Sequence, residues 1–140
     1  MDTEKTLTIQ QVASATGLTE HTLRYYERIG LIHPIDRACS GHRRYRESDI
    51  GWIEFLMKLR NTGMSIQQMQ QYSVLQRKGD STLPERVEML KVHYEQVQAQ
   101  LDCLMEHQTL IRGKIEYYSS VIEEMQCGED RQAETQAEPT

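Results

Sequence analysis

Two groups of basic side chains carry the most recognisable chemistry in this sequence. One lies in residues 19–28, where Arg24, Tyr25 and Arg28 follow one another closely. The other lies in residues 37–46, which contain four arginines and no acidic residue. Guanidinium groups form paired hydrogen bonds with phosphates and with the edge of guanine, and a tyrosine hydroxyl donates to phosphate oxygens. These residue types predict contact with a nucleic acid.

The spacing around the first group predicts two short helices that would present it. Thr8 and Gln11 form a capping-box pattern at the start of the first helix, and Gly17 stands where a helix commonly ends. Thr19 is placed to cap the second helix, which Gly30 closes. Two short helices joined by a tight turn outline a helix-turn-helix, whose second helix enters the major groove of DNA.

The second helix has an apolar face and a polar face. Leu23 and Tyr26 repeat at the spacing of a buried side, so the remaining side chains point outward. For this helix taken alone, the alternative to DNA contact is a basic face that is only in contact with solvent. The outward residues that we expect to contact DNA are His21, Thr22, Arg24, Tyr25 and Arg28.

The second basic group predicts a short β-hairpin. Its arms are expected near residues 35–38 and 43–46, on either side of the turn signal Ser40–Gly41. A hairpin beside a helix-turn-helix forms a wing, which can follow the DNA backbone next to the groove. A solvated turn is the alternative, although it leaves the arginine run unexplained.

Side chains alternate between the two faces of a hairpin. Arg44 and Arg46 therefore share one face, and Arg43 and Tyr45 share the other, so the four cannot all serve one purpose. The residues of this segment that we expect to contact DNA are Arg37, Arg43, Arg44 and Tyr45.

Three further helix starts follow the wing. Ser48 is expected to cap a helix that ends near Gly63, and Ser65 opens a second capping box whose helix ends near Gly79. A third start lies at residues 82–85, where a proline is tolerated in the first turn.

From Leu83 to Met125, apolar residues recur at alternating spacings of four and three. That is the 3.5-residue period of a coiled coil, and the narrow stripe requires a partner, most simply a second copy of the chain. Gln108 interrupts the stripe, as a residue that sets register does. The expected dimerisation residues are Val87, Leu90, Tyr94, Val97, Leu101, Leu104, Gln108, Ile111 and Ile115.

The charge of the chain is unevenly distributed. The net charge is −5, yet residues 1–80 hold 11 basic and 9 acidic residues whereas residues 81–140 hold 5 and 12. We therefore expect three parts: a mainly α, winged helix-turn-helix DNA-binding domain over residues 1–80, a dimerisation helix over 81–127 and a disordered acidic tail over 128–140. No apolar stretch predicts a membrane span or a signal peptide, and three scattered cysteines favour the cytoplasm.

Residues 8–79 resemble the DNA-binding region of the MerR family of transcription regulators. The motifs that carry the resemblance are Leu23–Glu27 followed by Gly30 and Leu31, and Gly41–Tyr45 in the wing. The resemblance implies an antiparallel homodimer that binds double-stranded promoter DNA and bends and untwists it, so that RNA polymerase can read an over-long promoter. It also implies that Arg24, Tyr25, Arg43 and Tyr45 contact DNA. No cofactor is expected.

The signal that such a regulator answers is less evident. Residues 50–65 are similar to the branch that responds to aldehydes and redox stress, but the cysteine often found in that helix is absent here. Cys39, beside the arginines of the wing, is the candidate redox residue. A metal-responsive regulator that uses Cys103, His107 and Cys127 is an alternative, as is an architectural DNA-binding protein without an effector.

An enzyme is not expected. The sequence contains no glycine-rich phosphate loop, and its five histidines are dispersed. A structural scaffold that uses the coiled coil alone would leave the arginine-rich wing without a purpose.

Overall fold

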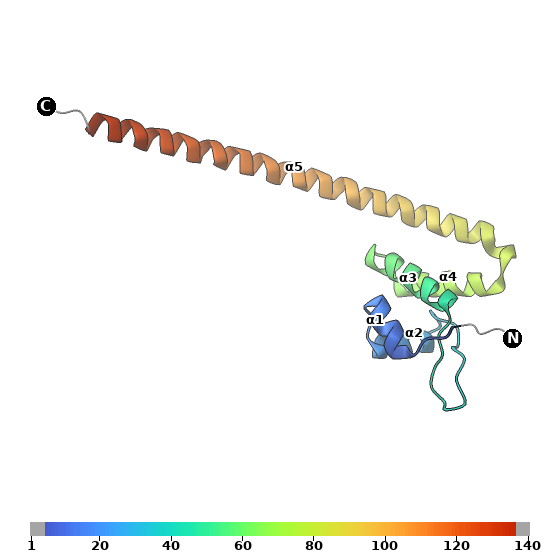
Figure 1. The fold of residues 1–140 in the computed structure, drawn as a ribbon. Helices are drawn as coiled ribbons and strands as arrows, with labels where there is room; N and C mark the ends of the chain where they lie inside the picture. The colour runs from blue at the N-terminus through green and yellow to red at the C-terminus, as the bar shows by residue number, and fades with distance from the viewer. Residues whose placement is uncertain (1–4, 137–140) are drawn as a thin grey trace. The chain divides into compact units, whose positions relative to one another are not determined.

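The computed structural model describes residues 5–136 of the 140-residue chain. Its elements in order are α1 (Ile9–Thr16), α2 (Glu20–Arg28), α3 (Glu47–Asn61), α4 (Ile66–Lys78), the 3₁₀ turn η1 (Asp80–Thr82) and α5 (Leu83–Gln136) (Figure 1). The chain divides into two compact units, residues 1–97 and 98–140. In the part described, none of the helices is both long and apolar enough to cross a membrane.

Local hydrogen bonds confirm the predicted helix-turn-helix. The Thr8 hydroxyl accepts from the Gln11 backbone amide at 3.2 Å, while the Gln11 side chain accepts from the Thr8 amide at 2.9 Å. Gly17 ends α1 with φ of 77°, a left-handed conformation that favours glycine. Thr19 then caps α2 by accepting from the Thr22 amide at 3.0 Å.

The wing is a looser structure than a regular hairpin. Its two arms, predicted at residues 35–38 and 43–46, meet at the isolated bridge Arg37↔Arg43, and the N-terminal segment joins through the bridge Leu7↔Tyr45. Gly41 turns the chain with φ of 85°. No continuous strand forms in the described residues, because arms this short gain too few backbone hydrogen bonds to make an independent two-stranded ladder.

The start of α3 corrects a prediction. Ser48 was expected to cap this helix, but the helix begins at Glu47 and its N-cap is Arg46. The carboxylate of Asp49 accepts from the Arg46 amide at 2.8 Å and accepts again, on its other oxygen, from the His33 imidazole at 2.5 Å. A buried carboxylate at the third helical position therefore replaces the hydroxyl cap and satisfies the first turn.

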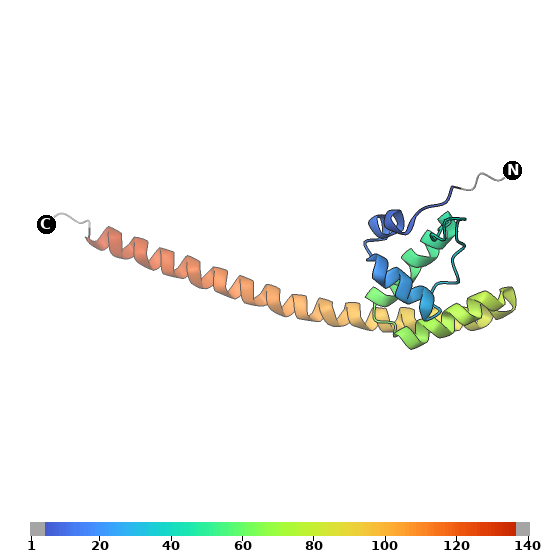
Figure 2. The same ribbon diagram turned by 90° about the horizontal axis from the view of Figure 1, so that it is seen from below.

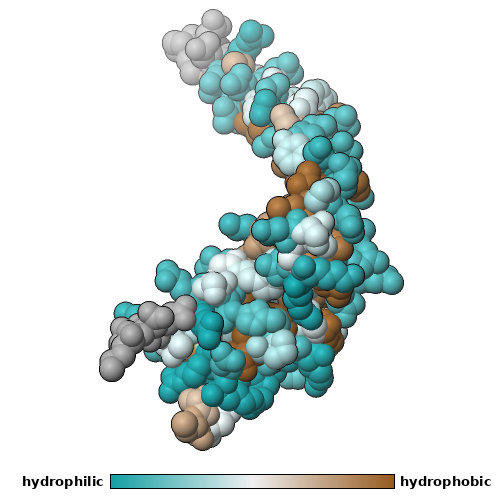
Figure 3. All heavy atoms as spheres, turned by 90° about the vertical axis from the view of Figure 1, so that its right-hand side faces the viewer, coloured by the Kyte–Doolittle hydropathy of each residue, from teal (hydrophilic) through white to brown (hydrophobic). Residues whose placement is uncertain are grey.

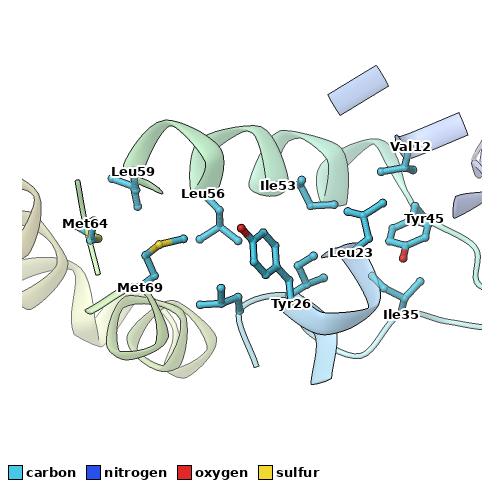
Figure 4. Packing of buried hydrophobic residues seen from close by; sticks show 12 residues of the cluster. Val12, Leu23, Tyr26, Ile35, Tyr45, Ile53, Leu56, Leu59, Met64 and Met69 are labelled. Carbon is cyan, nitrogen blue, oxygen red and sulfur yellow. The ribbon is translucent and has the colours of Figure 1, made fainter. Parts of the chain in front are cut away.

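One hydrophobic core joins the helices of the first unit to the wing. Leu23 from α2, Ile53 and Leu56 from α3 and Met69 from α4 are fully buried and face one another (Figure 4). The Trp52 indole donates to the Leu31 carbonyl at 2.8 Å, which fixes the linker after α2 on α3. The buried residues of this core come from α1 to α4 and from the wing, whose backbone Figure 2 shows from below.

The first turns of α5 belong to this unit as well. Leu90 packs against the core, and the buried His93 forms a hydrogen bond of 2.7 Å with the Thr62 hydroxyl at the end of α3. The Thr82 hydroxyl donates to the Leu75 carbonyl at 2.6 Å. These contacts hold the start of α5 on α3 and α4.

The second unit consists of the remainder of α5. The helix runs through Gly128 to Gln136, so the tail predicted to begin at residue 128 is helical as far as the structure describes it. One glycine costs a helix about 1 kcal/mol relative to alanine, which the good helix formers around it offset. Residues 137–140 of that predicted tail lie outside the described residues.

Candidate nucleic-acid interface

Helix α2 presents the polar face that its sequence predicts. Leu23 and Tyr26 are buried, whereas His21, Arg24, Tyr25 and Arg28 are exposed. Thr22 is half-buried, and its hydroxyl lies 2.8 Å from that of Thr19. Thr22 therefore takes part in the helix cap, while the other predicted residues remain open to a ligand.

Two contacts orient the exposed side chains of α2. Arg24 lies 3.4 Å from the Glu20 carboxylate one turn earlier, and half of its side chain is exposed. Arg28 stands 5.5 Å from the centre of the Tyr25 ring, in a cation–π arrangement. Arg24 can therefore leave a weak, solvated partner for a DNA group, since an exposed ion pair of this kind contributes at most about 1 kcal/mol.

Arg43 connects the wing to α2. Its Nε donates to the Glu27 carboxylate at 2.6 Å, and both side chains are largely buried, at 21% and 14% exposure. The other carboxylate oxygen of Glu27 accepts from the Ile35 backbone amide at 3.1 Å. Glu27 thus contacts both arms of the wing, the first through Ile35 and the second through Arg43, which indicates that Arg43 positions the wing.

Tyr45 does not lie at the surface where a DNA contact was expected. Its side chain is fully buried beside Val12 and Ile35 (Figure 4), so it is not accessible for the predicted contact with DNA. Arg43 and Tyr45, predicted to share one face, are both largely or fully buried. Burial, followed by the charge of Glu27, raises the pKa of Tyr45 above its usual value near 10.

Two of the remaining three arginines of the wing are exposed. Arg37 is exposed and donates to the Gly41 carbonyl at 3.0 Å, and Arg46 pairs with Asp36 at 3.0 Å. Arg44 is half-buried, and its backbone amide donates to the Asp36 carbonyl at 2.8 Å. Arg37 therefore has the accessibility that a phosphate contact needs, and Arg44 is partly accessible.

A groove of about 470 Å³ brings both basic groups together. It is lined by Thr8, Ile9 and Gln10 from the start of α1, Glu20 and Arg24 from α2, and Arg37, Gly41, His42, Arg43 and Arg44 from the wing. His21, Tyr25 and Arg28 are on α2 but do not line this groove. Gln10 and His42 were missed by sequence reasoning, although His42 stands within the arginine run that could have indicated it.

The cysteines form no joint site in the described residues. Cys39, Cys103 and Cys127 are all free and exposed, and no group of three or more potential metal ligands occurs in residues 5–136. Cys103 Sγ lies 3.7 Å from His107 Nε2. The predicted set of Cys103, His107 and Cys127 is therefore reduced to a pair.

The predicted seam of α5 is largely exposed in the single chain. Val87, Tyr94, Leu101, Leu104, Ile111 and Ile115 each show between 45% and 70% of their surface to solvent. Figure 3 shows hydrophobic residues in brown among hydrophilic ones on one face of the molecule. Leu90 and Val97 are half-buried, and Gln108 is exposed. A row of exposed apolar side chains, interrupted at Gln108, is typical of an interaction surface.

Comparison with known proteins agrees with this geometry. Residues 7–73 match the MerR helix-turn-helix regulatory protein family. The transcriptional regulator AdhR of Bacillus subtilis is 50% identical over 84 residues, which span 60% of each chain. The helix-turn-helix regulator YyaN of the same species is 32% identical over 128 residues, which cover 83% of this chain and 93% of YyaN.

Solved structures show the same fold. A MerR family regulator from Listeria monocytogenes is 35% identical with a TM-score of 0.88, covering 92% of this chain and 98% of its own. HiNmlR, a MerR family regulator lacking the sensor domain and bound to promoter DNA, is 29% identical with a TM-score of 0.76, covering 83% and 92%. With a basic groove beside an exposed recognition helix, the chain belongs to the MerR family of DNA-binding helix-turn-helix transcription regulators.

Proposed function

We propose that the chain acts in the cytoplasm as a homodimer that binds promoter DNA in a sequence-specific manner and distorts it to control transcription. The observation that carries this proposal is the groove between α2 and the wing, where Arg24, Arg37, Arg43 and Arg44 gather in a chain whose net charge is −5. Such a local excess of arginine in an acidic protein supports binding of a polyanion.

The side chains divide into two tasks. Arg24, on the exposed face of α2, reaches a base edge in the major groove, and His21 and Tyr25 on the same helix contact bases or phosphates beside it. Arg37 and Arg44 of the wing contact the phosphate backbone, which sets the register of the protein without reading sequence. Arg43 holds the wing at α2 through Glu27.

The exposed seam of α5 supports the homodimer. A second copy would cover apolar residues such as Leu104 and Ile111, each more than 60% exposed in one chain. Two copies would place two recognition helices at a fixed separation. A promoter whose half-sites do not match that separation must bend or untwist, at a cost that depends on its sequence. RNA polymerase would then respond to the altered promoter and not to the protein directly.

The proposed stimulus is a stress signal or a small electrophile, with Cys39 as the residue that senses it. Cys39 is an exposed free thiol in the wing, two residues from Arg37. A modified thiol there would change the segment that contacts phosphates. Replacement of Cys39 by serine should remove the response of transcription in vitro to an aldehyde or an oxidant, whereas an unchanged response would reject this role.

Binding of the purified protein to a labelled duplex from its own upstream region tests the main proposal. We expect a shift that a scrambled duplex does not reproduce and that weakens steeply as salt increases. Arg60, an exposed arginine of α3 outside the groove, supplies the matched control. Arg44→Ala should weaken binding while Arg60→Ala leaves it unchanged, and equal effects of the two substitutions would overturn the assignment of the groove.

A further inference from the structure

A thiol and an imidazole face each other on the surface of the second unit. Cys103 and His107 stand one helical turn apart on α5, both are exposed, and Cys103 Sγ lies 3.7 Å from His107 Nε2. Cys127, in the same helix, is also exposed and free, but Glu123 and Arg131 stand one turn from it. Cys103 and His107 thus form a pair of ligands of the types that bind borderline and soft metal ions, which Cys127 lacks.

The separation of the two atoms suits a single metal ion. Zinc binds cysteine sulfur at about 2.3 Å and histidine nitrogen at about 2.0–2.1 Å in tetrahedral geometry. Two ligands at those distances and at the tetrahedral angle are separated by about 3.6 Å. The observed 3.7 Å matches this value with both side chains in place.

The charge around the pair also favours a cation. From residue 92 to residue 111 the chain contains no lysine or arginine, while Asp102 and Glu106 stand next to the two ligands in sequence. Opposite charges attract even through solvent, so this acidic stretch favours the approach of a divalent cation. The nearest basic residues along the chain are Lys91 and Arg112.

The pair lies beside the predicted seam and not within it. With Leu101 and Leu104 at the two apolar heptad positions, Cys103 falls on the outer part of the helix and His107 at the edge of the seam. A metal ion held there would not compete with apolar pairing along α5.

We propose that Cys103 and His107 chelate one Zn²⁺ ion per chain. The thiol gives its proton to the solvent as the Zn–S bond forms, and the neutral imidazole donates its Nε2 lone pair. Water completes the coordination, because both side chains are exposed and no third potential ligand joins them in the described part of the chain. The ion would join two successive turns of α5. This proposal goes beyond DNA binding and does not rest on it.

Isothermal titration of the reduced full chain with ZnCl₂ tests the proposal. We expect one Zn²⁺ bound per chain, and an affinity that falls by at least about tenfold, or about 1.4 kcal/mol, in Cys103→Ser and in His107→Gln. Cys127→Ser is the matched control and should bind as the unaltered chain does. Co²⁺ should give a thiolate-to-metal charge-transfer absorption that Cys103→Ser lacks.

Three results would overturn the site. These are no Zn²⁺ binding by the unaltered chain, binding that survives either substitution of the pair, and binding that Cys127→Ser removes. In the first case the contact is a thiol–imidazole hydrogen bond and nothing more. Circular dichroism of each variant would show that the helix is intact, and the DNA-binding measurements above proceed without zinc, so failure of one proposal leaves the other standing.

Discussion

Arg24 projects from the exposed face of α2, where its guanidinium group can exchange one partner for another. Its contact with Glu20 is 3.4 Å long and lies in solvent, so little free energy is lost when the guanidinium turns to a guanine edge. Arg24→Ala should weaken operator binding by about 1–3 kcal/mol and relax the preference for one base pair. Fluorescence anisotropy with single-base operator variants measures both effects.

The matched control for this prediction is Arg60→Ala, outside the groove. A loss below a few tenths of a kcal/mol for Arg24→Ala, or a loss that is equal on all sequences, would contradict its assignment as a base contact.

Arg43 and Arg44 are neighbours in sequence but differ in surroundings. Arg43 is tied to Glu27 in a largely buried ion pair, so Arg43→Ala leaves a buried carboxylate with one partner fewer and should lower the free energy of unfolding by about 1–3 kcal/mol. Arg44→Ala should leave stability almost unchanged and lower the salt slope of DNA binding by about 1. Urea unfolding and a salt series separate the two residues.

The pairing of Arg43 with Glu27 can also be tested from the acidic partner. Glu27→Gln should reproduce the effect of Arg43→Ala, and the double variant should lose less than the sum of the two, because the residues act as a pair. Strict additivity would mean that Arg43 acts independently of Glu27.

The buried Tyr45 predicts a dependence of stability on alkaline pH. Its hydroxyl has no hydrogen-bond partner in the structure described, and its pKa is raised by burial and by Glu27. Above pH 10 the unfolded chain loses this proton while the folded chain keeps it, so stability falls as pH rises from there. Tyr45→Phe should remove that contribution and cost little at pH 7, since it removes a buried hydroxyl without a partner.

Urea unfolding at pH 7 and at pH 10.5 checks this prediction. A large loss of stability for Tyr45→Phe at pH 7 would show that the hydroxyl has a partner in solution.

At the scale of the elements, the sequence predicts where a helix begins when the cap of that helix is formed by nearby residues. The caps at Thr8, Thr19 and Ser65 depend on side chains within three residues, and all of them form as predicted. The exception is the start of α3, where the Asp49 carboxylate accepts from the Arg46 amide three residues earlier and is itself held by His33, sixteen residues away. A pattern read along the chain does not contain that contact.

The same difference between local and long-range contacts decides which features of the candidate site the sequence predicts. The outward direction of Arg24 follows from helical period, which is local, and was predicted. The burial of Tyr45 and the pairing of Arg43 with Glu27 depend on how the wing folds onto α2, and sequence alone placed both residues on DNA. Gln10 joins the groove from α1 for the same long-range reason.

Substitution of Gly128 tests whether α5 continues as a helix beyond this residue. Nothing lies within 4 Å of a methyl group built on Gly128, so alanine fits there without strain. In a helix, Gly128→Ala should raise stability of the local turns by up to about 1 kcal/mol and increase the helical circular dichroism signal. Gly113→Ala, in the middle of the same helix, is the control. An increase for Gly113→Ala but none for Gly128→Ala would place residue 128 outside the helix.

At the scale of the whole molecule, the proposed function requires two copies of the chain. The apolar seam of α5 is exposed over residues such as Leu101, Ile115 and Met125, which is costly for a chain that remains alone. Pairing along this seam would give the protein two arginine-bearing grooves, and an operator would contact both at once. Avidity of this kind raises affinity without any new contact in the single groove.

Sedimentation of the full chain at micromolar concentration, alone and with a full-length operator, tests this claim most directly. We expect a dimer in both cases, with two chains on each operator, and we expect Leu104→Asp to yield a monomer that binds the operator far more weakly. A single protomer that binds the complete operator with undiminished affinity would contradict the account.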